Sequence, residues 1–304
     1  MARIACTTWE GGGNVAVFRA LAEQLRARGH EAGIRVGWDA PVDVDGDVLL
    51  VDHMTTVEGL EVALASGKPV AAVVHTLWSF VASLEGSFAP SGYLDVLDRV
   101  DRALVFSIPE VDRPAAVPAN VRWVGPALEP EGPDSGWAPP PRSLVVVSLG
   151  TTDMGEGPVL QRVLDALEPL PVDVLATVGD HLDPSTLRVP ANAEIRGFVR
   201  HAALLPHADL FIGHAGHGGI MAALAFGVPM VLVPLDRDQP HNAARVEAAG
   251  AGRSVPRDAE PAAIRTAIEA VRTGLRERTR AIELANVIAG YVDAAVHEVE
   301  DLLR

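Results

Sequence analysis

The chain has 304 residues, of which 48% are hydrophobic and 21% charged, the balance of a soluble globular protein with one large domain or two ordinary ones. Its formal charge of -15 disfavours duplex nucleic acid as a partner, and its single cysteine, Cys6, excludes an intrachain disulfide. We expect a cytoplasmic protein. No apolar run approaches the ~20 residues of a membrane span, and the first residues are unlike a signal peptide.

The first half of the sequence alternates short apolar runs with segments of helical periodicity. We expect strands at residues 3–7, 48–51, 70–74 and 103–106, and helices at residues 16–28, 58–65 and 93–100. Gly29, directly after the first helical segment, is a typical C-terminal cap. Such alternation predicts a parallel sheet with helices on both faces.

A proline-rich segment interrupts this alternation at residues 126–142. It reads PALEPEGPDSGWAPPPR, which cannot form a regular element. We interpret it as a semi-rigid linker between an N-terminal domain, residues 1–125, and a C-terminal domain, residues 143–304.

The C-terminal domain repeats the pattern of the first half. Strands are expected at residues 143–149, 172–178, 193–197, 210–212 and 230–234, and helices at residues 159–167, 220–226, 242–249 and 261–271. Residues 276–303 are strongly helical in composition. The whole chain is therefore predicted to be an α/β protein with two parallel sheets.

The most specific signal lies between residues 210 and 252. The turn His214-Ala-Gly-His-Gly-Gly follows an apolar run, and Gly227-Val-Pro, Asp238-Gln239 and Asn242-Ala-Ala-Arg-Val come after it in that order. This ordered set resembles the donor-sugar signature of the GT-B nucleotide-sugar glycosyltransferases, more narrowly the branch that decorates macrolides, enediynes and other natural products. A Gly-rich turn alone would be weak, because many α/β proteins carry one for packing.

The resemblance implies the GT-B fold, in which two Rossmann-like domains face each other. It places the donor nucleotide in the C-terminal half and the acceptor in the N-terminal half. It also implies that the last helix returns to the N-terminal domain. Ligands would lie outside the carboxyl ends of the strands, as in other open α/β sheets.

The Gly-rich turn is predicted to bind the diphosphate of the donor. Backbone N–H groups at a helix N-terminus attract phosphate, and Gly216, Gly218 and Gly219 would let the backbone approach it. His214 would add a side-chain hydrogen bond to a phosphate oxygen, although a histidine at a strand end is often structural. Gly219 stands where many relatives carry Ser or Thr, so one hydroxyl donor is missing.

Two further segments are predicted to contact the donor through the resemblance. Ser148, Thr151 and Thr152 would lie along the phosphates, although Ser and Thr after a strand also serve as helix caps. Phe198 and Val199 would form the wall of the nucleobase site. The alternative for Phe198 is an ordinary core aromatic.

Asp238 and Gln239 fit the pair that reads the sugar in this family. A carboxylate and an amide can bracket neighbouring sugar hydroxyls, because one accepts and the other both donates and accepts. The alternative is a solvated loop, since Asp-Arg-Asp-Gln-Pro is also good turn chemistry.

The acceptor side departs from the family pattern. The family usually carries a Gly-His pair after the first strand, whose histidine is the general base, but this chain has Gly13-Asn14. Asn14 could orient a hydroxyl but cannot take its proton. Glu10, His53 and His75 are the other candidates, and we rank His75 first.

The N-terminal half is also shorter than in the family between Trp78 and Tyr93. A shorter segment there implies a more open cleft, an unusual acceptor, or a second copy or other partner chain that completes the acceptor site.

These features predict an inverting glycosyltransferase that moves a sugar from a nucleoside-diphosphate donor to a small hydrophobic natural-product acceptor. We expect no metal and no cofactor, with the helix N-terminus in the place of a cation. Two alternatives stay open: a nucleotide-sugar epimerase of the same fold, and a non-catalytic protein that binds nucleotide sugars. The sequence does not decide between UDP and dTDP, the sugar, the acceptor, the general base or the oligomeric state.

Overall fold

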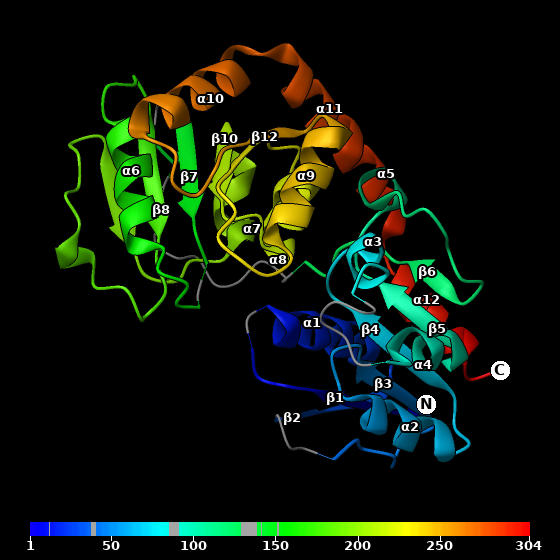
Figure 1. Cartoon of the computed structure of the whole chain (residues 1–304). Helices are drawn as coiled ribbons and strands as arrows, with labels where there is room; N and C mark the ends of the chain where they lie inside the picture. Colours follow the sequence, from blue (N-terminus) through cyan, green and yellow to red (C-terminus); the bar gives the residue numbers. More distant parts are fainter. Residues whose placement is uncertain (12, 38–40, 85–90, 129–138, 141, 151) are drawn as a thin grey trace. The chain divides into compact units, whose positions relative to one another are not determined.

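The computed structural model describes residues 1–11, 13–37, 41–84, 91–128, 139–140, 142–150 and 152–304. The chain forms two compact units, unit 1 with Met1–Glu129 and Gly290–Arg304, and unit 2 with Pro130–Ala289 (Figure 1). Each unit contains a six-stranded sheet in which neighbouring strands run parallel. The predicted α/β fold with two parallel sheets is therefore confirmed. Most of the expected linker lies outside the described residues.

Unit 1 has the strand order β2-β1-β3-β4-β5-β6. Its strands are β1 (Arg3–Thr8), β2 (Glu31–Val36), β3 (Val48–Asp52), β4 (Val70–Val74), β5 (Arg102–Val105) and β6 (Val121–Trp123). Its helices are α1 (Asn14–Ala27), α2 (Val57–Ala65), α3 (Trp78–Val81), α4 (Tyr93–Arg99), α5 (Pro109–Asp112) and α12 (Ala294–Asp301).

Both faces of this sheet are buried at its centre, which explains why the central strands β3 and β4 are almost entirely apolar. Val48 and Leu50 of β3 pack in one core with side chains of α1 and α12. Leu49 and Val51, which point to the opposite face, pack with α2, α3 and α4. A parallel sheet covered by helices on both sides has no polar face, so alternation disappears from its sequence.

Unit 2 has the strand order β12-β11-β10-β7-β8-β9. Its strands are β7 (Leu144–Ser148), β8 (Asp173–Thr177), β9 (Ala193–Arg196), β10 (Leu210–Gly213), β11 (Met230–Leu232) and β12 (Gly252–Ser254). Its helices are α6 (Gly157–Leu167), α7 (His201–Leu204), α8 (His217–Ala225), α9 (Gln239–Ala249), α10 (Pro261–Thr273) and α11 (Leu275–Ile288), with 3-10 turns η1 (Pro184–Thr186) and η2 (Leu205–His207). No helix among the described residues is both long and apolar enough to cross a membrane.

The structure contains each predicted strand and helix of the two sheets, with ends that differ by three residues or fewer. The sequence did not predict β2, β6 and β12, each of which lies at the edge of a sheet. β6 and β12 have only three residues, and β2 is largely exposed. Edge strands of this kind lack the long apolar run from which a buried strand can be predicted in a sequence.

The helical tail is broken, whereas its composition alone suggests continuous helix. α11 ends at Ile288, the 3-10 turn η3 (Ala289–Tyr291) follows, and Asp293 adopts a left-handed conformation with φ 60° before α12. α12 then packs on unit 1, where Ala295, Val296 and Val299 join the core beside α1.

This packing predicts that α12 stabilises unit 1. Val296 is fully buried, so Val296→Asn would place an amide without partners in the core and lower the free energy of unfolding by about 3 kcal/mol. His297→Ala, on the exposed side of the same helix, is the matched control and should change it by about 0.5 kcal/mol or less. Urea unfolding measures both; equal effects would contradict the assigned packing.

Candidate functional site

The donor-like turn of unit 2 lies at the carboxyl ends of two neighbouring central strands. β10 pairs with β7 in a register that sets Gly213 opposite Ser148. The segments that follow, residues 149–150 from β7 and 214–216 from β10, therefore emerge side by side. This is the edge of an open parallel sheet at which ligands bind.

Two glycines leave the space that the imidazole of His214 occupies. A Cβ atom on Gly216 would lie 2.4 Å from Nε2 of His214, and one on Gly150 would lie 3.2 Å from its Cε1. Gly150 also has φ +110°, a conformation that L side chains rarely adopt. The absence of a side chain at Gly216 therefore makes room for the histidine ring. Gly218 has no such role, because a Cβ there would meet nothing within 4 Å.

The surroundings of His214 favour its neutral form. Burial lowers the pKa of this imidazole. The backbone of Ser148 and the carboxylates of Asp238 and Glu156 raise the pKa, but burial has the larger effect. Its Nδ1 is buried and has no hydrogen-bond partner among the described residues. A bound phosphate would supply both a partner for the ring and a negative charge that raises the pKa again.

A strained residue sets the start of α8. Ala215 adopts a left-handed conformation with φ 64°, which costs a residue with a Cβ about 1–2 kcal/mol. Gly216 follows as the N-cap of α8 and forms no side-chain cap hydrogen bond. The first N–H groups of the helix are thus available to an anion at the sheet edge. α8 begins at His217, three residues before the predicted start, because tertiary contacts override the low helix propensity of Gly218 and Gly219.

The other predicted donor residues are placed as follows. Ser148 and Thr152 are half-buried beside the turn from β7, and Thr151 lies outside the described residues. Phe198 is 63% exposed in the loop after β9, and Val199 is half-buried. Phe198 is therefore not a core aromatic, and its ring is available to a flat ligand.

Asp238 and Gln239 begin α9 and have different environments. Asp238 is half-buried, and its Oδ2 accepts a hydrogen bond of 2.8 Å from Nδ2 of Asn242. Gln239 is only 2% exposed, and its Oε1 accepts hydrogen bonds from the backbone N–H groups of Leu235 and Asp236. The amide of Gln239 therefore holds the loop before α9.

Two residues that sequence reasoning did not select belong to this region. Asn242 is fully buried and also donates from Nδ2 to the carbonyl of Ala215 at 3.1 Å. His201 lies edge-on to Phe211, with ring centroids 5.5 Å apart, and burial and then the charge of His214 lower its pKa to about 4. Asn242 stands in the motif quoted above, but nothing in the sequence around His201 marks it.

A second polar cluster lies at the carboxyl ends of β3 and β4 in unit 1. Asp52, the last residue of β3, is fully buried, and its carboxylate accepts four hydrogen bonds. The donors are Nε2 of His75 at 3.1 Å and the N–H of Met54 at 2.9 Å to Oδ1, with the Thr8 hydroxyl at 2.7 Å and Nδ2 of Asn14 at 3.2 Å to Oδ2.

These donors keep Asp52 ionised. Burial alone would raise the pKa of the carboxyl, but the charge and hydrogen bond of His75, then the charge of His53 and the Thr8 hydroxyl, hold it well below its usual range. A carboxylate can only accept, so Nε2 of His75 must carry a proton. Nδ1 is then the basic nitrogen of His75.

His53 and Tyr93 extend this cluster. The rings of His53 and His75 are 4.8 Å apart, and Nδ1 of His53 forms a 2.8 Å hydrogen bond with the Tyr93 hydroxyl. Burial, and then the charge of Asp52, raise the pKa of Tyr93 above its usual range, so its hydroxyl stays protonated.

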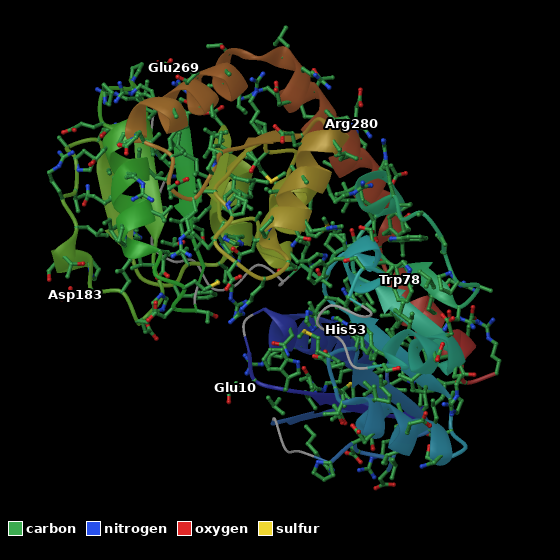
Figure 2. The ribbon with its side chains drawn as sticks, in the orientation of Figure 1. Glu10, His53, Trp78, Asp183, Glu269 and Arg280 are labelled. Atoms are coloured by element: carbon green, nitrogen blue, oxygen red, sulfur yellow. The ribbon has the colours of Figure 1, made fainter. Side chains whose placement is uncertain are left out.

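Of the four acceptor-side residues named from the sequence, three lie in this cluster: Asn14, His53 and His75. Asn14 is 1% exposed, and its Nδ2 donates to Thr8, Asp52 and the carbonyl of Trp9. His75 is paired with Asp52. Glu10 is exposed and lies apart from His53 in unit 1, as Figure 2 shows.

The same cluster has the ligand types of a metal site. Potential ligand atoms of Asp52, His53 and His75 lie within 4.8 Å of one another. However, the four hydrogen bonds fill the roughly four lone-pair positions of the Asp52 carboxylate. A cation would have to displace His75 or a second donor, so these residues fit a histidine–carboxylate pair better than a metal centre.

Comparison with known proteins agrees with this architecture. The chain aligns over 100% of its length with the glycotransferase of kitacinnamycin, covering 99% of that chain with a TM-score of 0.83 and 20% identity. It also aligns over 100% of its length with the calicheamicin glycosyltransferase CalG4, covering 98% of that chain with a TM-score of 0.77 and 22% identity. These likenesses define the class: the chain has the GT-B fold of glycosyltransferases.

The sequence comparisons match parts of this chain. Residues 161–296 match the family described as erythromycin biosynthesis protein CIII-like, C-terminal domain. The 4'-demethylrebeccamycin synthase of Lentzea aerocolonigenes is 33% identical over 216 residues, 68% of this chain and 50% of that protein. The resemblance to GT-B glycosyltransferases of natural-product biosynthesis is confirmed. The chain spans about half the length of the curated relatives it matches.

The strain at Ala215 leads to a stability prediction. Ala215→Gly should raise the free energy of unfolding by up to about 1 kcal/mol, because relief of the left-handed strain exceeds the added chain entropy. Ala223→Gly, in the interior of α8, is the control and should lower it. Thermal unfolding distinguishes the two, and a loss of stability in Ala215→Gly would show that the turn is unstrained.

The environment of His201 leads to a pH prediction. The pKa of His201 in the folded protein is about 4, below the ordinary 6.5, so the unfolded chain binds the proton more readily. The free energy of unfolding should therefore fall as the pH drops from 6.5 to about 4. The loss should reach about 2–3 kcal/mol near pH 4. His201→Gln should flatten the dependence of unfolding free energy on pH between these values, and the exposed His207→Gln should not. Equal slopes in parent and His201→Gln would refute the assignment.

Proposed function

We propose that this protein binds a nucleoside-diphosphate sugar in unit 2 and transfers the sugar to a small natural-product acceptor. The observation that carries the proposal is the segment of residues 214–219, a turn followed by the start of α8. In it, the ring of His214 lies between Gly150 and Gly216, and the N-cap Gly216 forms no side-chain cap hydrogen bond. The match of residues 161–296 to the erythromycin CIII-like family supports it.

The diphosphate would lie on this turn. N–H groups of the first turn of α8 and the imidazole of His214 would donate to its oxygens, and the helix dipole adds a positive potential. The same groups would stabilise the charge that develops on the diphosphate as the bond to the anomeric carbon breaks. A cation is not required for this step.

The nucleobase and the sugar would be held by side chains on either side of the turn. The exposed ring of Phe198 offers a flat apolar surface for the base, with Val199 beside it. Asp238 would accept hydrogen bonds from sugar hydroxyls. Gln239 would act indirectly, because its oxygen is engaged by Leu235 and Asp236 and its side chain is buried.

The acceptor hydroxyl would be activated by His75. Asp52 fixes the ring through Nε2, so the acceptor proton would pass to Nδ1 as the oxygen attacks the anomeric carbon. The carbon–oxygen bond to the diphosphate breaks on the opposite face, and a single displacement of this kind inverts the anomeric configuration. Asn14 would support Asp52, since its amide nitrogen donates to the carboxylate and has no basicity.

The proposal is tested by separating donor binding from turnover. The parent protein should bind UDP or dTDP in calorimetry and form a glycoside of inverted configuration with a panel of phenolic and alcohol acceptors. His75→Gln should keep nucleotide affinity and lower kcat about a hundredfold or more, because it removes the base. Asp52→Asn should also lower kcat, because the ring loses its orienting carboxylate.

The control is a second histidine–carboxylate pair in unit 1. Nε2 of His30 lies 3.4 Å from Oε1 of Glu300. His30→Gln should leave kcat unchanged. Unchanged turnover in His75→Gln under saturating donor would disprove His75 as the base. Absence of any nucleotide binding would disprove the donor site, and epimerised sugar from donor alone would favour the epimerase.

A further inference from the structure

One buried amide bridges the two parts of the donor site in unit 2. Nδ2 of Asn242 donates to the carbonyl of Ala215 at 3.1 Å and to Oδ2 of Asp238 at 2.8 Å. Both acceptors share one nitrogen, so they lie within about 6 Å of each other. We propose that Asn242 is a positioning residue that couples the diphosphate turn to the carboxylate that contacts the sugar. The inference rests on the proposed function.

The orientation of this amide follows from its partners. A carbonyl and a carboxylate both accept, so Asn242 must present its NH₂ group to them. Its Oδ1 is consequently buried with no hydrogen-bond partner among the described residues. A fully buried acceptor without a partner destabilises the folded state. An apolar side chain of similar size would avoid this cost but could not donate to Ala215 and Asp238, so the amide is present for these two hydrogen bonds.

The side chain of Asp238 binds Asn242 instead of capping its helix. It is the N-cap of α9, where an aspartate normally accepts a hydrogen bond from the backbone of the first turn. Here it makes no side-chain cap hydrogen bond, and Oδ2 accepts from Asn242 one turn later. The carboxylate therefore contacts the side chain of Asn242, whose Nδ2 also donates to the carbonyl of Ala215.

The other end of the bridge holds a strained residue. Ala215 keeps its left-handed conformation only if the surroundings fix it, and the hydrogen bond from Asn242 to its carbonyl is one such restraint. Because Ala215 precedes the N-cap Gly216, this restraint also sets the direction of α8. Asn242 thus fixes the groups for the diphosphate and the group for the sugar through one nitrogen.

This arrangement predicts that loss of the Asn242 amide lowers the affinity for the sugar part of the donor more than the affinity for the nucleotide. Asn242→Ala should reduce the preference for UDP-glucose or dTDP-glucose over UDP or dTDP about tenfold, the effect of one hydrogen bond to a charged group. Calorimetry with these four probes measures the ratio of dissociation constants. Asn242→Asp should lose the preference as well, because its carboxylate repels both acceptors.

A second asparagine in the same unit, the half-buried Asn192, is the matched control. Nδ2 of Asn192 donates to the carbonyls of Leu167, Leu170 and Val172, and its Oδ1 also lacks a partner among the described residues. Asn192→Ala should lower the melting temperature without changing the ratio. Asp238→Asn, which leaves Asn242 in place, should lower the ratio by itself, and adding Asn242→Ala should then have little further effect.

The outcomes separate this inference from the function on which it rests. A reduced ratio in Asn242→Ala that is absent from Asn192→Ala and non-additive with Asp238→Asn supports the inference. An unchanged ratio in Asn242→Ala, or losses that add fully to those of Asp238→Asn, overturns it while donor binding stands. A parent protein that binds none of the four probes overturns the proposed function, and the inference with it.

Discussion

The pairing of β10 with β7 is the constraint on which the candidate site of unit 2 depends. Because Gly213 lies opposite Ser148, the turns that leave these strands must share the same small volume. Gly150 and Gly216 meet this requirement and leave room for the imidazole of His214 between them. The helix N-terminus and the histidine take their positions from this register, and the loop that carries Asp238 follows β11, which pairs with β10 on its other side.

Unit 1 is organised around a buried charge. The carboxylate of Asp52 is removed from water, and four donors from four separate segments compensate it. Such a group orients its neighbours strongly, because each hydrogen bond to a buried charge is costly to lose. Asn14 and His75 are thereby fixed on one carboxylate, although the family pattern places a histidine at position 14.

The candidate site of unit 2 departs from what stability alone favours. Ala215 has a left-handed backbone, Asn242 carries a buried oxygen without a partner among the described residues, and His201 is held in a neutral state. Departures of this kind are expected where groups are fixed for binding rather than for folding. Their grouping around the carboxyl ends of β10 and β11 is the structural argument for a ligand there.

The sequence by itself determined the two parallel α/β units, because strands buried on both faces and amphipathic helices leave strong local patterns. It also located the Gly-rich segment of residues 214–219. Edge strands β2, β6 and β12 were not predictable, since they are short or exposed. Only the tertiary structure decided that Phe198 is exposed, that Gln239 is buried and that His75 pairs with Asp52. Exposure and pairing arise from contacts between segments far apart in the chain, which no local pattern encodes.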